Sequence, residues 1–178
     1  TPTTQYDQLL VTGSVTLGNA TLNVLQFSGF NVSNVSQQSY LIIDNNGTAD
    51  AVVGVFNSPL AVPLPEGSPI SYLGGTLYIT YQGGDGNDVV LNTQPVVNGT
   101  SGADTLTLTP TATGYNFIFA PNGVPNPTIS VVGNVPFTFN GNDADDLLTA
   151  QLSAAGVLPN INYNGGSQDF TSRPPNSV

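Results

Sequence analysis

The chain lacks most of the side chains that carry out catalysis. Its 178 residues contain no His, Cys, Lys, Trp or Met, and Arg173, which precedes Pro174, is the only basic residue. Without His or Lys, a Ser or Thr nucleophile has no usual general base, and without His, Cys or Met the softer metals lose their usual ligands. The sequence therefore argues against an enzyme, with no catalytic residue and no required cofactor.

Positive charge is also scarce, and the formal net charge is −10. Such a chain repels polyanions, so we expect no nucleic-acid partner. No apolar run approaches the ~18 residues of a membrane span, so no span is expected either. Carboxylates remain, and they could form a glycosidase pair or bind a hard cation such as calcium. The adjacent Asp145 and Asp146 would lie on opposite faces of a strand, which makes them a poor catalytic pair.

What is abundant is a pattern of short, half-buried strands. Apolar and polar residues alternate with a period of two in residues 76–81, 105–109 and 115–119, and clusters of Gly, Asn and Asp close each run. Two continuous apolar runs, residues 9–11 and 40–43, are expected to be buried on both faces. The predicted fold class is all-β, as right-handed parallel β-solenoid-like modules with short strands, and β-sandwich domains are the alternative.

One segment has features of a helix. Residues 143–146 supply an N-cap candidate and an acidic first turn, the apolar residues that follow have helical spacing, and Gly156 stands at the end. A repeat that includes this segment favours a strand instead.

That repeat is a Gly-Asp turn. Residues 83–91 (GGDGNDVVL) match the calcium-binding nonapeptide G-G-x-G-x-D-x-U-x. Weaker copies begin at Gly99 and Gly141, and a fragment begins at Gly165. The candidate calcium ligands are Asp85, Asp88, Asp104 and Asp146. Because the copies are not consecutive, the alternative is a Gly-Asp turn that only leads into a strand.

With these motifs in place, the chain resembles large bacterial surface proteins with autotransporter-associated β-strand repeats. Residues 6–18 (YDQLLVTGSVTLG) and 81–91 (YQGGDGNDVVL) look like the opening and closing phrases of one module. Residues 97–107 (VNGTSGADTLT) and 163–166 (YNGG) are similar to the repeat turns, as degenerate forms of those in RTX proteins. The resemblance implies a right-handed parallel β-solenoid near the end of a long array.

These observations lead to an expected domain plan. Residues 1–93 form a β-strand-repeat module that ends in the Gly-Asp turn, residues 94–170 form a second β module with degenerate turns, and residues 171–178 form an extended tail. The chain begins as though it were a processed product or part of a longer array.

The expected function is structural. We interpret the chain as an extracellular or cell-surface subunit of a surface layer, adhesin stalk or filament that self-associates through strand edges or coil stacking. The alternatives are a calcium-stabilised surface module and a carbohydrate-binding module. Five sequons are candidate glycan sites, at Asn19, Asn31, Asn34, Asn46 and Asn98.

Overall fold

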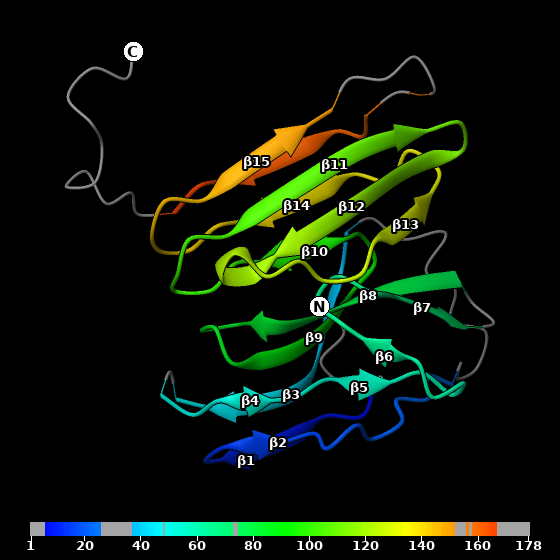
Figure 1. Ribbon diagram of the computed structural model, residues 1–178. Coiled ribbons are helices and arrows are strands. Elements are labelled where there is room, and N and C mark those ends of the chain that lie inside the picture. Colours follow the sequence, from blue (N-terminus) through cyan, green and yellow to red (C-terminus); the bar gives the residue numbers. More distant parts are fainter. Residues whose placement is uncertain are drawn as a thin grey trace.

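The protein folds as an all-β structure (Figure 1). The computed structural model describes residues 6–25, 37–47, 49–72, 75–151, 156 and 158–166. The only helical element in these ranges is the single 3-10 turn η2, Pro121–Gly123. Within the same ranges, no helix is long and apolar enough to cross a membrane.

The first half of the chain builds a five-stranded sheet and two small two-stranded sheets. The large sheet has the order β1-β3-β9-β8-β7, in which β1 and β3 are parallel and the other neighbours are antiparallel. The small sheets are β2-β4, which is parallel, and β5-β6, which is antiparallel. The bounds are β1 Leu9–Thr12, β2 Val15–Thr16, β3 Ser39–Asn46, β4 Val52–Val53, β5 Phe56–Asn57, β6 Pro63–Leu64, β7 Pro69–Tyr72, β8 Gly75–Gly83 and β9 Asp88–Asn92.

The second half builds two further sheets that face each other. One is entirely parallel, in the order β10-β14-β16, and the other has the order β13-β12-β11-β15, with only β11 and β15 parallel. The bounds are β10 Val96–Asn98, β11 Thr105–Thr111, β12 Gly114–Ala120, β13 Ile129–Val132, β14 Phe137–Asn140, β15 Leu147–Ala150 and β16 Ile161–Asn164.

The alternation that predicts strands also decides what is buried. Along β11 and β12 every second residue is buried, and the residues between them are half-buried. The buried side chains of β12 are aromatic, and Tyr115 and Phe117 pack edge-to-face on Phe137 of the opposite sheet, with ring centroids 6.0 and 5.1 Å apart. Period-two alternation thus places one face of each strand against the other sheet.

The apolar side chains form two core clusters. The first lies among residues 17–91 and includes Ile79 and Val89, which have no exposed surface. The second lies among residues 97–139 and also contains Tyr78, which β8 contributes from the first half of the chain. Thr93 closes the first half, where its N–H donates to the carbonyl of Gln38, and the carbonyl of Pro95 accepts from Thr138 in the second.

The all-β prediction is confirmed, whereas a parallel solenoid along the whole chain is not shown. Parallel ladders are short, antiparallel pairs such as β11-β12 and β8-β9 interrupt them, and none of the sheets is closed. The facing sheets of the second half are compatible with a sandwich-like arrangement (Figure 1).

In the described part of the ambiguous segment, residues 147–150 form the strand β15 and no helix is present; residues 152–155 lie outside the described residues. β15 pairs in parallel with β11, with Leu147 opposite Thr105. The N–H of Leu147 donates to the carbonyl of Asp104, and the N–H of Gln151 donates to that of Leu108. A neighbouring strand edge that accepts these hydrogen bonds overrides the helical spacing of the segment.

One burial prediction is wrong. Leu9 and Leu10 are 56% and 73% exposed, because β1 is an edge strand whose only neighbour is β3. The run at residues 40–43 lies inside the same sheet, where Tyr40 and Ile43 are buried and Leu41 and Ile42 are half-buried.

Candidate functional site

Two of the predicted acidic residues meet in one stack of turns. The turns that follow β10 and β14 lie in register, since Asn98 pairs with Asn140 and the N–H of Gly99 donates to the carbonyl of Asn140. In the same stack, Asp146 Oδ1 accepts the N–H of Asp104 at 2.9 Å. The structure therefore brings together two copies that are 42 residues apart in the sequence.

Both carboxylates in this stack accept backbone N–H groups, and Asp146 accepts its hydrogen bond from the neighbouring copy. Asp104 is 1% exposed, and it accepts hydrogen bonds from the N–H of Thr100 at 2.5 Å and the N–H of Asn122 at 2.8 Å. Asp146 lies over Gly141, where a Cβ would come within 2.2 Å of Asp146 Oδ2. Glycine is required at this position because the carboxylate occupies the space that a side chain would take.

The pKa of Asp146 is raised above its ordinary value. Burial is the main cause, the hydrogen bond from Asp104 opposes it, and the charges of Asp104, Asp145 and Asp143 add to the rise. Asp146 Oδ2 is buried and has no hydrogen-bond partner.

The other two predicted ligands belong to the first half of the chain. Asp88 is 5% exposed, its Oδ1 accepts the N–H of Asn45 at 2.8 Å, and its Oδ2 fills the space above Gly84. Burial raises the pKa of Asp88, the bond from Asn45 lowers it, and the charges of Asp85 and Asp44 raise it. Asp85 itself is exposed in the turn.

Beside this turn, buried amide groups converge on one loop. The side-chain amides of Asn45 and Asn87 both donate to the carbonyl of Asp50, and Asn87 also donates to the carbonyl of Gly47. Across the ranges described, no three acidic side chains are grouped so that they could hold a metal ion. The hydrogen bonds of Asp88 and Asp104 fit carboxylates that order their turns, and calcium binding stays a prediction.

Glu66 is a buried acid that the sequence reasoning missed. It lies between β6 and β7, its Oε2 accepts the N–H of Tyr81 on β8 at 2.8 Å, and its Oε1 accepts the N–H of Asn98 on β10 at 3.1 Å. Burial raises the pKa of Glu66 to about 7, against hydrogen bonds from Thr80, Tyr81 and Asn98 that lower it. One signal was available, because Glu66 is the only Glu in the chain and stands between Pro65 and Gly67.

Glu66 joins the two halves of the protein at a strand edge. The N–H of Thr138 on β14 donates to the carbonyl of Pro95, and the N–H of Gly99 donates to the carbonyl of Asn140. Because N–H groups alternate in direction along a strand, the N–H of Asn98, next to Gly99, points away from β14. Glu66 accepts this outward N–H of the edge strand β10. The carboxylate thus replaces the strand that would otherwise pair there.

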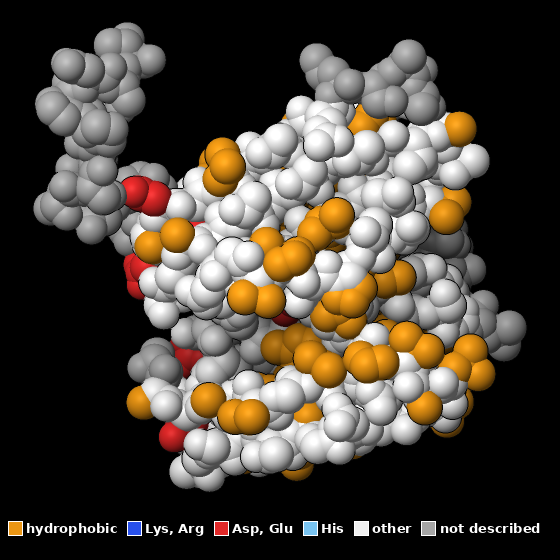
Figure 2. Space-filling view, in the orientation of Figure 1, with side chains coloured by type: hydrophobic (Ala, Val, Ile, Leu, Met, Phe, Trp, Pro, Cys, Tyr) orange, Lys and Arg blue, Asp and Glu red, His pale blue; other side chains and the backbone are white. Residues whose placement is uncertain are grey.

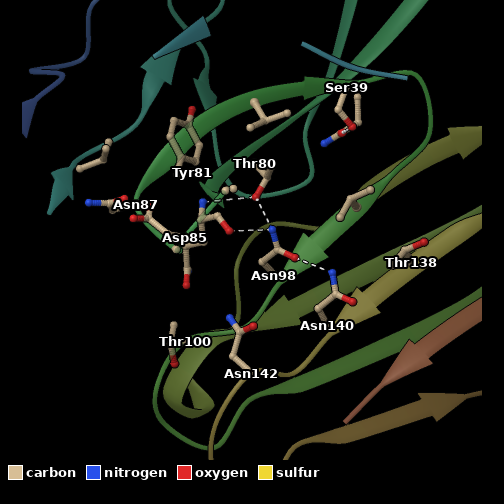
Figure 3. Close-up of a pocket in the computed structure, with 18 of the residues that line it drawn as sticks. Ser39, Thr80, Tyr81, Asp85, Asn87, Asn98, Thr100, Thr138, Asn140 and Asn142 are labelled. Atoms are coloured by element: carbon tan, nitrogen blue, oxygen red, sulfur yellow. Dashed lines mark hydrogen bonds between the residues drawn. The ribbon is translucent and has the colours of Figure 1, made fainter. Parts of the chain in front are cut away.

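A polar groove runs between the two halves, beside this junction (Figure 3). One wall is the outer face of β10, β14 and β16, and the other comes from β3, β8 and β9 and from the turn after β8. Asn140 Nδ2 donates to Asn98 Oδ1 at 2.7 Å, and Asn98 Nδ2 donates to the carbonyl of Gln82 at 2.8 Å, so an amide ladder crosses from one wall to the other.

The surface around these features carries little charge. Figure 2 shows that the acidic side chains visible on this face lie along one edge of the molecule, and that most of the remaining surface is uncharged. The groove is lined by two carboxylates, Asp85 and Asp143, and by no basic side chain.

The sequons differ in accessibility. Asn19 and Asn46 are exposed, whereas Asn98 is 9% exposed and its Nδ2 is engaged by Gln82, which leaves no room for a glycan in the folded chain. Asn31 and Asn34 lie outside the described residues.

Comparison of the chain with protein-family models, with curated proteins and with solved structures found no match.

Proposed function

We propose that this chain is an extracellular structural protein, a subunit or module of a surface layer, stalk or filament, and that copies join end to end. The observation that carries the proposal is the presence of parallel edge strands at two opposite ends of the molecule (Figure 1). An end of this kind can be extended by another copy without any change in the fold.

One end is formed by β1 and β2. Leu9 of β1 pairs in parallel with Ile43, Val15 of β2 pairs with Val52, and a parallel bridge joins Thr21 to Asn57. Three segments within residues 9–21 therefore pair, in the same order, with three segments within residues 43–57, and residues 9–21 form the outer layer at this end. The exposed Leu9 and Leu10 are part of this layer.

The other end is formed by β15 and β16. β16 continues the parallel ladder of β10 and β14, so that Val97, Phe139 and Tyr163 form one column. The rings of Phe139 and Tyr163 are stacked with centroids 5.6 Å apart, and Tyr163 is 42% exposed. The next ring or apolar side chain of this column would come from a second copy.

At both ends of the molecule, backbone N–H groups of the edge strands point away from the neighbouring strand. The carbonyls of Asn160 and Asn164 accept from β14, so the N–H of Tyr163, between them, points to the outer edge of β16. The N–H groups of Val15 and Leu17 donate to β4, so the N–H of Thr16 points outward from β2. Natural sheets blunt such edges with Lys or Pro, and β1, β2, β15 and β16 contain neither.

Two opposite but different ends favour head-to-tail association, which forms open filaments when the contact does not close into a ring. Sedimentation velocity over a wide concentration range, with electron microscopy of the same samples, tests this. We expect a mass that grows with concentration and fibres of uniform width. A single monomeric species at millimolar concentration would contradict the proposal.

Two proline variants locate the contact. Tyr163→Pro and Thr16→Pro each remove one outward N–H and leave the bonds to the inner strand intact, as proline on an edge strand allows. Each variant alone should stop assembly. The matched Thr16→Ala should keep it, whereas Tyr163→Ala, which retains the N–H and removes only the ring, should weaken assembly without stopping it.

A mixture of the two proline variants gives the sharper result. Each retains the end that the other has lost, so an equimolar mixture should form dimers and nothing larger. Fibres in the mixture, or assembly of either variant alone, would show that these edges do not make the contact.

A further inference from the structure

The groove between the two halves is large and open. Its volume is about 1390 Å³. Pockets that enclose a small ligand are typically about 300–1,000 Å³. A groove of this size, open along its length between two sheet faces, suits a chain that lies across it better than a small molecule (Figure 3).

The lining is dominated by side chains that both donate and accept hydrogen bonds. Nine amides and five Ser or Thr hydroxyls line the groove. An amide offers a carbonyl oxygen and an NH₂ group together, so it can pair with a hydroxyl in either direction. The amides are Gln37, Gln82, Asn87, Asn92, Asn98, Asn140, Asn142, Asn162 and Asn164.

Part of this lining is a regular grid. The parallel register places Val96, Thr138 and Asn162 in one row across three strands, and Asn98, Asn140 and Asn164 in a second row. Neighbouring strands are about 4.8 Å apart, and residues two apart on one strand are about 6.6 Å apart. The wall therefore presents polar groups at a repeat comparable to the length of a sugar ring.

The two sheets present mainly polar side chains to the groove, whereas Tyr78 of β8 packs into the second core cluster. Val97, Phe137 and Phe139 have no exposed surface because they point the other way, into the second core cluster. Two sheets that only needed to pack would meet through apolar side chains. The polar side chains of Thr138 and Asn140 are half-buried and those of Asn162 and Asn164 are exposed, so this wall has hydrogen-bonding groups that a ligand can reach.

The charged side chains that line the groove limit the chemical class of ligand that it can bind. Among the described residues the groove is lined by no basic side chain, and Asp85 and Asp143 add negative charge, so a phosphorylated or carboxylated ligand would be repelled. Only a few small apolar side chains, such as Val52, Val90 and Val96, line it, so a peptide would find no pockets for its own apolar side chains.

We propose that this groove binds a neutral polysaccharide, whose hydroxyls pair with the amide grid of β14 and β16. This goes beyond the structural role, since a subunit with such a groove would attach its assembly to a glycan matrix. Tyr81 is the aromatic residue of the described groove lining; it is 8% exposed and its hydroxyl donates to the carbonyl of Leu64, so it offers no platform to a sugar ring and hydrogen bonds carry the recognition.

Native affinity electrophoresis tests the proposal with the full chain. Gels contain a soluble α-glucan, a soluble mixed-linkage β-glucan, a galactomannan or, as the charged comparison, polygalacturonate. We expect at least one neutral polymer to retard the protein and polygalacturonate to leave its mobility unchanged. Retardation by none of the neutral polymers, or by polygalacturonate alone, would overturn the proposal.

A double variant then locates the binding. Thr138→Ala with Asn162→Ala removes two neighbouring groups of the grid, and Asn162 is exposed, so the fold should tolerate the change. We expect the affinity for the retarding polymer to fall at least tenfold, measured from mobility against polymer concentration. Asn116→Ala, the same substitution on β12 outside the groove, should have no effect. Equal affinities of the double variant and the wild type, both with native melting temperatures, would place the binding elsewhere.

Discussion

Replacing Glu66 by Gln should remove a large part of the pH dependence of stability. Glu66 is fully buried, and its two oxygens accept N–H groups from β8 and from β10. Gln keeps the shape but has one acceptor and one donor, so its NH₂ group would face a backbone N–H. That mismatch leaves a buried donor unsatisfied and should cost about 1–3 kcal/mol in the acidic range, where Glu66 is protonated.

The sign of the pH effect follows from the raised pKa. Burial raises the pKa of Glu66 from 4.5 to about 7, so the folded state holds this proton more tightly than the unfolded state. The resulting stabilisation is complete below pH 4.5 and is lost as the pH rises to about 7. With 1.36 kcal/mol for each pKa unit, the wild type should lose about 3 kcal/mol across this window through Glu66.

The assay is urea unfolding followed by circular dichroism between pH 4 and pH 8. The difference in unfolding free energy between wild type and Glu66→Gln should shrink by about 3 kcal/mol from the acidic to the basic end. Asn116→Ala on β12, which changes no titratable group, is the control and should keep the wild-type profile. Parallel profiles for wild type and Glu66→Gln would refute the reasoning, because they would mean that the three donors hold Glu66 ionised throughout.

Other features give sharp expectations. Phe137→Ala removes a ring with no exposed surface from the second core, so it should lower the unfolding free energy by about 3–5 kcal/mol in urea titrations. Gly99→Ala would place a Cβ 2.3 Å from the backbone oxygen of Gly141 and should cost about 1–3 kcal/mol or more, whereas Ser101→Ala at the exposed tip of the same turn should cost little. Chelation should lower the melting temperature only slightly, because backbone N–H groups already engage the turn carboxylates, and a large rise on adding calcium would contradict this. Trypsin should leave even the heat-denatured chain uncut, since the only basic residue precedes Pro174, and fragments on a gel would contradict that.

Local pattern was enough to predict the strands. Thr alternates with Leu in residues 105–109, and Tyr and Phe alternate with Asn116 and Ile118 in residues 115–119. A period of two predicts a strand in both segments, and these strands are β11 and β12. The Gly-Asp turns were predictable for the same reason. A glycine followed by an Asp a few residues later is a local signal, and in the structure the Asp carboxylate lies over that glycine at Gly84 and Gly141.

The sequence by itself thus determined an all-β chain, the places of its turns and its lack of His, Cys and Lys side chains. It did not determine which strands pair, because pairing depends on contacts between distant residues. The turns at Gly99 and Gly141 lie too far apart in sequence to look like neighbours. They stack because the chain between them folds back on itself, with β12 as the antiparallel partner of β11 and β13 as the antiparallel partner of β12.

Tertiary structure alone decided the burial of particular residues and the groove. Leu9 and Leu10 form an apolar run like that of residues 40–43, but they are exposed because β1 has a neighbour on one side only. Glu66 belongs to no sequence motif. Burial raises its pKa, against the backbone N–H groups of Tyr81 and Asn98 that lower it, and β8 and β10 supply these groups only in the folded chain. The amides of the groove lie far apart in sequence and face one another only after both halves have folded, because side-chain direction is local whereas proximity is not.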